Sequence, residues 1–415
     1  MRATAEGTTA IAAAGREPAR EPAASRSVGS AATDRRLNAV LRPLAAASFV
    51  AVVARSLPGE SAYDFSTLYN GATSFLHGHP VYVDSGYVLT PSGLLLSSPL
   101  GLLPRQTGRE LLVLLTAACA IGAGLVVLRM LDRSWRSPVG AAVLLGLALS
   151  ETVTFTMVLG NINTVLAVLV ALALWGQTRG RDLPAGVALG LAVALKPIAG
   201  PLLLLPLIGR RWRCLAVAVA LPTVTNIVGI LLVAAPEQFL HVTLPDLTSV
   251  RPAFNVSAGY AGLYLGLPHL VVLAVRVAIA ALALASVWWS QRVPDAALRL
   301  SVQAGALSLG VFLVSSLSEA YWSIVVLPLL LTVVRPSSPM HSWVAWLGVY
   351  LFATQDVWPT QPLLPHVGQA FAQLHPTVGW LLLLLAVVSW SWHQRRPGEV
   401  HSGLAQPQVG ALGPS

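Results

Sequence analysis

An aspartate stands just after the first long apolar run of the chain, at the start of the segment YDFSTLYNGATSFLHGHPVYV (residues 63–83). Asp64 is the first acidic residue of this segment, and the aromatic residues Tyr63 and Phe65 flank it. A partly desolvated carboxylate is well suited to accept a proton from a hydroxyl group. Asp64 is therefore our candidate for a general base that acts on a lipid-linked substrate at a membrane surface. An ordinary solvated loop aspartate is the alternative.

Two further polar clusters follow where later apolar runs meet. In ETVTFTMVLGNINTVL, Asn161 and Asn163 flank one isoleucine, so a short turn could direct both amides at one ligand. A helix cap is the alternative, because asparagine commonly begins helices. In SLSEAYWS, Glu319 precedes Tyr321 and Trp322, a combination that is common in sugar sites. Tyr and Trp are also ordinary residues of a membrane interface.

We expect the side chains of these clusters to hold a sugar or an acceptor, with help from the segment after Asp64 and from one later loop. Any one of them also fits a role in packing. Asp84, in the turn-like sequence VYVDSGY, is expected to be structural or to bind the acceptor. The candidates for sugar or acceptor binding are Tyr69, Asn70, His79, Tyr82, Asn161, Asn163, Asn255, Glu319, Tyr321 and Trp322.

Two basic residues are candidates for binding a phosphate group. Arg251 is one of the few arginines on the side of the membrane where we place Asp64, and a guanidinium fits a phosphate as a forked donor. Lys196 lies before Pro197 within a long apolar segment, and charges at membrane depth are costly and usually functional. No residue cluster has convincing metal-ligand spacing, so we expect no metal and no other cofactor, while a divalent ion at the phosphate stays open.

The composition is that of a polytopic membrane protein. Of the 415 residues, 55% are hydrophobic and only 10% are charged, whereas soluble proteins carry about 25% charged residues. The basic residues lie in short loops between apolar runs, so the net charge of +9 indicates topology rather than a nucleic-acid partner. Cys119 and Cys214 lie in apolar runs without CxxC spacing, which argues against a disulfide or zinc site. Motifs of ATP, nicotinamide and serine-hydrolase enzymes are missing from the sequence.

The apolar runs predict an all-α fold with about ten transmembrane helices, and with juxtamembrane helices in the first external loop. The excess of Lys and Arg on one side predicts that both termini are cytosolic. Asp64 then faces the external, periplasmic side of the plasma membrane. The predicted spans cover residues 38–57, 110–128, 138–157, 161–175, 214–234, 269–289, 299–317, 320–334, 343–355 and 376–392.

One apolar segment breaks the alternation of sides. Residues 185–213 carry arginines at both flanks, and each half around Lys196 is too short to cross a hydrocarbon core of about 30 Å at 1.5 Å per residue. We interpret the segment as a re-entrant hairpin of two half-helices with Lys196 at its tip. A groove for a lipid tail is expected beyond that tip. A single kinked span with a snorkelling lysine is the alternative.

We expect one transmembrane catalytic domain, which covers residues 35–394. Residues 1–34 are rich in Ala, Arg, Glu and Ser and lack the apolar core of a signal peptide. Residues 395–415 are similar in character. Both end segments are therefore expected to be disordered cytosolic tails.

Several segments resemble one enzyme family. An aspartate shortly after the first span, followed by NGATSFLHGHPVY and TPSGLLLSSPLGLLP, is similar to the GT-C glycosyltransferases of family GT87. GNIN and GLAVALKPIAGPLLLLPLIGRRWR fit the same family, and the resemblance covers roughly residues 38–392. More narrowly, ETVTFT, FNVSAGYAGLYLGLP and AWLGVYLFATQDVW resemble the branching α-(1→3)-arabinofuranosyltransferases of actinobacterial cell walls. Many family members have Tyr-Pro-Pro where this chain has Thr90-Pro91-Ser92.

The resemblance implies an inverting transferase that uses a polyprenyl-phosphate sugar, here decaprenylphosphoryl-arabinofuranose. The implied acceptor is a 3-hydroxyl of an α-(1→5) arabinan in arabinogalactan or lipoarabinomannan, and Asp64 matches the family's catalytic aspartate. A mannosyltransferase that uses polyprenyl-phosphate-mannose would share every feature read from the residues. A lipid flippase or transporter, a different class of protein, would carry broken helices and charges at the bilayer midplane. Only Lys196 fits that description.

Overall fold

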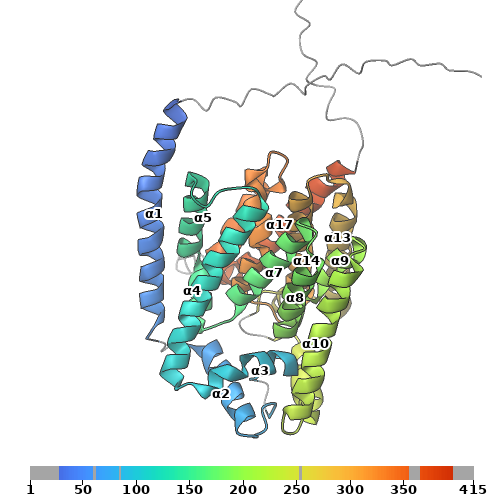
Figure 1. Ribbon diagram of the computed structural model, residues 1–415. Helices are drawn as coiled ribbons and strands as arrows, with labels where there is room; N and C mark the ends of the chain where they lie inside the picture. Colours follow the sequence, from blue (N-terminus) through green and yellow to red (C-terminus); the bar gives the residue numbers. More distant parts are fainter. Residues whose placement is uncertain (1–27, 59–61, 84–85, 252–254, 355–364, 396–415) are drawn as a thin grey trace, which may run out of the picture.

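The computed structural model describes residues 28–58, 62–83, 86–251, 255–354 and 365–395, and these residues form helices and no strands. Most of the long helices run in roughly one direction, while α2 and α3 lie across one end of the bundle (Figure 1). Asp84 and most of the two predicted tails lie outside the described residues. Residues 28–34, which we expected in the N-terminal tail, belong to the first helix.

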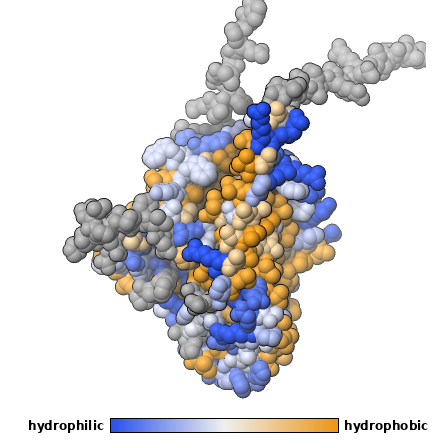
Figure 2. Space-filling model, turned by 90° about the vertical axis from the view of Figure 1, so that its left-hand side faces the viewer, coloured by the Kyte–Doolittle hydropathy of each residue, from blue (hydrophilic) through white to orange (hydrophobic). Residues whose placement is uncertain are grey.

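Long apolar helices establish the chain as a multi-pass membrane protein. Among the described residues, six helices are long and apolar enough to cross a membrane, and a bent pair would make a seventh. Figure 2 shows hydrophobic residues over much of one face of the molecule and a hydrophilic group at its upper end. The long helices are α1 (Val28–Ser56), α4 (Arg105–Met130), α10 (Trp212–Leu232), α13 (His269–Trp289), α14 (Ala296–Val314) and α17 (Pro365–Gln394).

Shorter elements fill the space between the long helices, so the expected count of ten spans is not reproduced by long helices alone. The α-helices among them are α2 (Tyr63–Leu76), α3 (Pro91–Ser97), α5 (Pro138–Leu149), α6 (Glu151–Leu159), α7 (Asn163–Thr178), α8 (Asp182–Leu195), α9 (Leu204–Ile208), α11 (Leu244–Thr248), α12 (Ala258–Tyr264), α15 (Leu327–Leu331) and α16 (Trp343–Ala353). The 3₁₀ and π elements are η1 (Ser98–Leu102), η2 (Pro197–Leu203), η3 (Phe239–Thr243), η4 (Ser290–Arg292), η5 (Ala320–Val326), η6 (Thr332–Val334) and η7 (Pro339–His341).

Two predicted spans are broken. The run 138–157 bends by 49° between α5 and α6, because Ser150 adopts an extended backbone that interrupts the helical ladder. The run 320–334 changes from η5 to α15 at Leu327, next to Pro328, which has no N–H to donate to the preceding turn. Apolarity therefore identified these segments, while backbone chemistry decided that neither is a straight helix.

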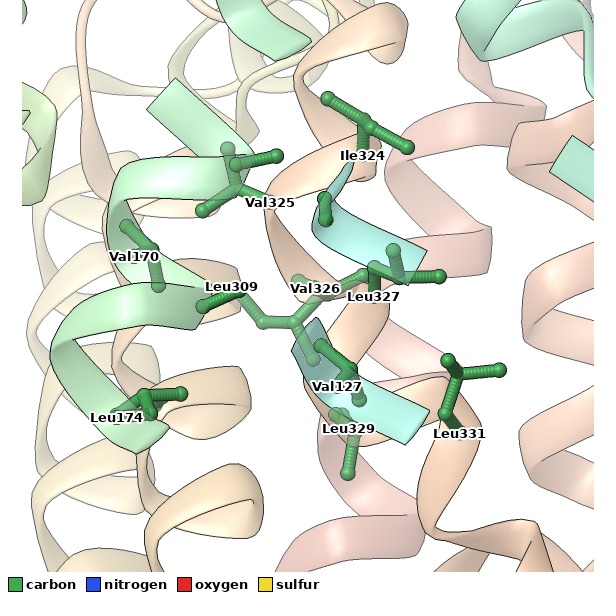
Figure 3. Packing of buried hydrophobic residues seen from close by; sticks show 14 of the residues in the cluster. Val127, Val170, Leu174, Leu309, Ile324, Val325, Val326, Leu327, Leu329 and Leu331 are labelled. Atoms are coloured by element: carbon green, nitrogen blue, oxygen red, sulfur yellow. The ribbon is translucent and has the colours of Figure 1, made fainter. Parts of the chain in front are cut away.

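The core beneath the broken run 320–334 fixes its position. Val326 and Leu329 are fully buried, and they pack with Val170 of α7 and Leu309 of α14 (Figure 3). Truncating a residue such as Leu329 to alanine in a core of this kind costs about 2–5 kcal/mol. This packing holds the start of η5, where Glu319 and Tyr321 lie, against the ends of α6 and α7.

The segment 182–211 folds back on itself. α8 packs against η2, and Arg211 Nη1 lies 2.8 Å from Asp182 Oδ1, so the two ends of the segment are adjacent. α8 also packs closely on α10. Gly186 allows this approach, because a Cβ at this position would lie 2.6 Å from the Cys214 carbonyl oxygen. Beyond the bend, α3 contacts both α8 and α10, and it takes up space in which we expected a lipid groove.

Candidate active site

Asp64 lies in the first turn of α2, and side chains from two distant parts of the chain hold its carboxylate. Asn161 Nδ2 donates a 2.6 Å hydrogen bond to Asp64 Oδ2, and the Tyr321 hydroxyl donates to the same oxygen at 2.9 Å. Asp64 remains half-buried, whereas Asn161 and Tyr321 are buried. The carboxylate is therefore oriented by a rigid inner wall and keeps an accessible side.

The GNIN turn supplies two amides to the site, and it also caps a helix. Gly160 ends α6 with φ +74°, and the Asn161 side-chain oxygen accepts the backbone N–H of Asn163 at 3.0 Å. Asn161 thus caps α7 with its oxygen while its nitrogen reaches Asp64. Of the two alternatives drawn from the sequence, the hydrogen bond at the start of the helix is observed, and the binding of a ligand by both amides stays a prediction.

Lys196 enters the same cluster from the bend between α8 and η2. Its backbone is extended (φ −144°, ψ 115°), as expected for a residue before a proline. Its Nζ donates to Asn163 Oδ1 at 2.8 Å and to Asn161 Oδ1 at 3.2 Å, and it lies 5.5 Å from the centre of the Trp322 ring. Two amide oxygens and an aromatic face therefore stabilise the ammonium group beside Asp64.

Glu319 closes the cluster from the linker that joins α14 to η5, outside the membrane-spanning helix. Glu319 Oε2 accepts a 3.2 Å hydrogen bond from Trp322 Nε1 and also contacts the Tyr321 hydroxyl. Burial and, second, the nearby Asp64 carboxylate raise the pKa of Glu319 to about 7, although Tyr321, Lys196 and Trp322 act to lower it. Chemically, the cluster combines an oriented carboxylate, a second acid that gains a proton near neutrality, and one cation.

The structure brings together Asp64 and the predicted residues Asn161, Asn163, Lys196, Glu319, Tyr321 and Trp322. They come from α2, the α6–α7 turn and the start of α7, the α8–η2 bend, and η5 with the linker before it. Such convergence of charged and polar groups in a membrane protein marks a functional site.

Asn255 has a different position, outside this cluster. Its Nδ2 donates to the Ser316 carbonyl oxygen at 2.6 Å, and its Oδ1 accepts the backbone N–H of Ser318 at 3.1 Å. Its remaining contacts are to the backbone of Arg251 and Ser257. The amide that we expected to bind a sugar therefore braces the linker that carries Glu319.

Arg251, our first phosphate candidate, is ion-paired with Asp246. Both side chains are about three-quarters buried, with 28% and 22% of their area exposed. The carboxylate already neutralises the guanidinium, which leaves less of its charge for a phosphate. Among the described residues, Lys196 is the predicted cation that contacts the cluster around Asp64.

Four predicted sugar-binding residues lie apart from that cluster. The Tyr69 hydroxyl donates to the Leu103 carbonyl oxygen at 2.9 Å, and Asn70 Oδ1 accepts from Arg105 at 3.1 Å. His79 is exposed. Tyr82 is fully buried against the Tyr87 and Phe239 rings, and burial raises the pKa of its hydroxyl. Among the described residues, Tyr69 and Tyr82 therefore contribute to the packing of the chain.

Arg109 is a buried residue of the site's framework that the sequence reasoning missed. Its Nη2 donates to the carbonyl oxygens of Ser56 at 2.8 Å and Val158 at 2.7 Å, which ties α4 to the ends of α1 and α6. Its guanidinium carbon lies 5.8 Å from the centre of the Phe65 ring, next to Asp64. An arginine at the edge of the predicted span 110–128 was the signal that could have identified it.

Ser92 is a second residue that the sequence reasoning missed. Its hydroxyl donates to the Ala194 carbonyl oxygen at 2.7 Å, and its backbone N–H donates to Asn226 Oδ1 at 3.1 Å. Ser92 therefore joins α3 and α10 to the backbone two residues before Lys196. The Thr90-Pro91-Ser92 sequence, where many family members have Tyr-Pro-Pro, thus helps to hold the lysine in place.

Comparison with known proteins identifies the family of this chain. The family model for glycosyltransferase family 87 matches residues 87–316, which include the GNIN turn and Lys196. This chain belongs to glycosyltransferase family 87. It is therefore a glycosyltransferase of the membrane, as the resemblance of its segments predicted.

Curated relatives match over most of their length. An α-(1→3)-arabinofuranosyltransferase of Mycobacterium tuberculosis is 37% identical over 339 residues, which cover 79% of this chain and 78% of the relative. The enzyme of the same name from Mycolicibacterium smegmatis is 35% identical over 370 residues, 85% of this chain and 84% of the relative. The one from Corynebacterium glutamicum is 30% identical over 343 residues, with 80% and 81% covered.

Proposed function

We propose that this family 87 glycosyltransferase is an α-(1→3)-arabinofuranosyltransferase that introduces branches into cell-wall arabinan. The names of its relatives support the sugar and the linkage. The donor is decaprenylphosphoryl-arabinofuranose, and the acceptor is a 3-hydroxyl of an α-(1→5) arabinan in arabinogalactan or lipoarabinomannan. The single observation that carries the chemistry is the orientation of the Asp64 carboxylate by Asn161 and Tyr321. The same Asn161 side chain also accepts a hydrogen bond from the Lys196 ammonium group.

The reaction is a single displacement with inversion. Asp64 removes the proton from the acceptor hydroxyl while the hydroxyl oxygen forms a bond to the anomeric carbon. The bond from that carbon to the lipid phosphate breaks on the opposite face, and its electron pair leaves with the phosphate. Orientation by two hydrogen bonds keeps the basic lone pairs of Asp64 directed at the acceptor and avoids reorganisation during the step.

The leaving phosphate gains negative charge and needs a cation. We assign this role to Lys196 in place of Arg251, because Arg251 already pairs with Asp246. Among the described residues, the hydrogen bonds of Lys196 are to the neutral amide oxygens of Asn161 and Asn163, so its ammonium group is not tied to a carboxylate by direct contact as Arg251 is. Electrostatic stabilisation by one such group is typically worth about 10²–10³ in rate.

We also propose the membrane placement that this chemistry requires. The segment 182–211 is a re-entrant hairpin whose ends lie at the cytosolic surface and whose tip brings Lys196 to the site. The adjacency of Asp182 and Arg211 supports this. The Lys/Arg excess near the ends of the helices supports cytosolic termini and a periplasmic active site in the plasma membrane.

The donor is tested by a direct comparison. Purified enzyme receives a linear α-(1→5) arabinan with decaprenylphosphoryl-arabinofuranose, or the same acceptor with polyprenyl-phosphate-mannose. We expect 3-linked arabinose from the first donor and no product from the second. Mannose transfer would instead favour the mannosyltransferase alternative. In a deletion strain of the source organism, linkage analysis of arabinan should show loss of 3,5-branched arabinose.

A further inference from the structure

The hydroxyl of Tyr321 contacts two acids at once. It lies 2.9 Å from Asp64 Oδ2 and also within hydrogen-bond distance of Glu319 Oε2. A phenolic hydroxyl has one hydrogen to donate, and an ionised carboxylate can only accept. If both acids were ionised, one of these two oxygen–oxygen contacts would hold no hydrogen. The contacts therefore require one additional proton on Asp64 or Glu319.

The surrounding donors decide which acid carries this proton. Asp64 Oδ2 accepts from both Asn161 and Tyr321, an arrangement that stabilises the ionised form. Glu319 accepts one further hydrogen bond, the longer one of 3.2 Å from the Trp322 indole. The proton therefore belongs on Glu319, which donates it to the Tyr321 oxygen while Tyr321 donates its own hydrogen to Asp64.

We propose that Glu319 and Asp64 share a single proton through Tyr321, so that the active state has a neutral Glu319 beside an ionised Asp64 that acts as the base. This inference rests on the proposed function. It makes Glu319 and Tyr321 positioning residues that act through Asp64, in place of the sugar-binding residues that the sequence indicated. A neutral Glu319 leaves a single negative charge beside Lys196, and it keeps the Tyr321 hydrogen pointed at the base.

The groups that face Glu319 agree with this assignment. Asp64 of α2 and Lys196 of the α8–η2 bend are the charged groups that act on it, and burial and Asp64 both favour its neutral form. The described helices that pack on η5 add few other titratable side chains. These are Glu151 at the start of α6, Tyr350 on α16 and Arg299 on α14. Arg299 lies 15 residues, or about 22 Å, before the C-terminal end of α14, which leads into the linker with Glu319.

The decisive variant is Glu319→Gln, because glutamine donates an N–H to Tyr321 but cannot ionise. The wild-type kcat/KM should fall roughly tenfold between pH 7 and pH 8.5, as Glu319 loses its proton. In Glu319→Gln this fall should shrink to less than about twofold, because the glutamine side chain has no proton to lose in this range. Tyr321→Phe, which removes the bridge, should lower kcat at every pH and leave KM for the acceptor nearly unchanged.

Two results would overturn the shared proton. One is a rise in acceptor KM in Glu319→Gln with an unaltered pH profile, which indicates sugar binding. The other is the lack of the expected band in infrared difference spectra of the resting enzyme. A neutral carboxyl band should be present at pH 6, disappear by pH 8.5, and be absent from Glu319→Gln. The matched control, Glu110→Gln, changes a glutamate that bonds to Gln106 on the exposed side of α4, and its band should equal that of wild type.

The proposed function can fail separately. Full activity in Asp64→Asn would remove the base itself and with it the premise of the shared proton. An inactive Asp64→Asn together with a wild-type pH profile and band in Glu319→Gln would leave the base in place. That combination would reject only the shared proton.

Discussion

Asn161 lies 97 positions after Asp64 in the chain, yet its side-chain nitrogen is 2.6 Å from the Asp64 carboxylate. The same asparagine accepts hydrogen bonds from the Lys196 ammonium and from the first backbone N–H of α7. One side chain thus links the candidate base, the candidate phosphate-binding cation and the start of a membrane helix. The geometry of the site therefore depends on how the GNIN turn is held.

Asp64→Asn should reduce transfer by at least about 10²–10⁴-fold, which is the range for loss of a general base. The isosteric amide keeps the side-chain volume, so expression and donor binding should stay near wild type. The measurement is product formation under saturating donor, with donor affinity determined separately. Turnover close to wild type would remove Asp64 as the base.

Lys196→Met should lower kcat by about 10²–10³-fold, because the leaving phosphate loses its cation. Lys196→Arg should restore little activity, since a planar guanidinium does not fit the compact site formed by Asn161, Asn163 and the Trp322 ring. Arg251→Met serves as the matched comparison and should cost much less. If Arg251→Met is the more damaging variant, Arg251 and not Lys196 stabilises the leaving phosphate.

Gly160→Ala should destabilise the protein by about 1–3 kcal/mol or more, because a non-glycine residue is strained at φ +74°. The added Cβ would also lie 2.4 Å from Arg109 Nη1 and 2.5 Å from the Phe65 Cβ, next to Asp64. Gly180→Ala has a similar positive φ and open space, so it measures the backbone strain alone. Thermal unfolding in detergent should rank Gly160→Ala below Gly180→Ala, and equal melting temperatures would contradict the close packing.

Ser92→Ala should lower kcat about 5–10-fold, because it removes a hydrogen bond to the backbone just before Lys196, worth about 0.5–1.5 kcal/mol. Ser97→Ala on the same helix is the control, since the Ser97 hydroxyl donates to the Gly93 and Leu94 carbonyl oxygens of its own helix. The rates of the two variants are compared at equal folded fraction. Equal loss in both would mean that α3 does not position the lysine.

Single cysteines at Gly180 and Gly209 test the hairpin, in a background where Cys119 and Cys214 are replaced. Gly180 lies just before the segment 182–211 and Gly209 lies near its end, and both should react with a membrane-impermeant thiol reagent from the cytosolic side. His79→Cys, on the exposed loop after α2, should react only from the opposite side. Labelling of positions 180 and 209 from different sides of the membrane would show that the segment is a single span.

The amino-acid sequence by itself determined the class of fold and most members of the site. Runs of apolar residues demand membrane helices, because an unsatisfied backbone is too costly in lipid. A charged residue beside such a run, as at Asp64, or within one, as at Lys196, stands out against that background and points to function. A residue before a proline is disfavoured in the helical conformation, so the bend at Lys196, which precedes Pro197, could also be predicted from the sequence.

Only the tertiary structure decided which polar residues meet. Asn161, Asn255 and Tyr82 were all predicted from the sequence to bind a sugar or an acceptor, yet one orients Asp64, one braces a linker and one lies in an apolar cluster. A membrane helix is apolar on every side, so its sequence has little periodicity to indicate which face meets which neighbour. That choice is made by close packing between helices, and packing at Gly160 brings Arg109 and Phe65 together beside the base.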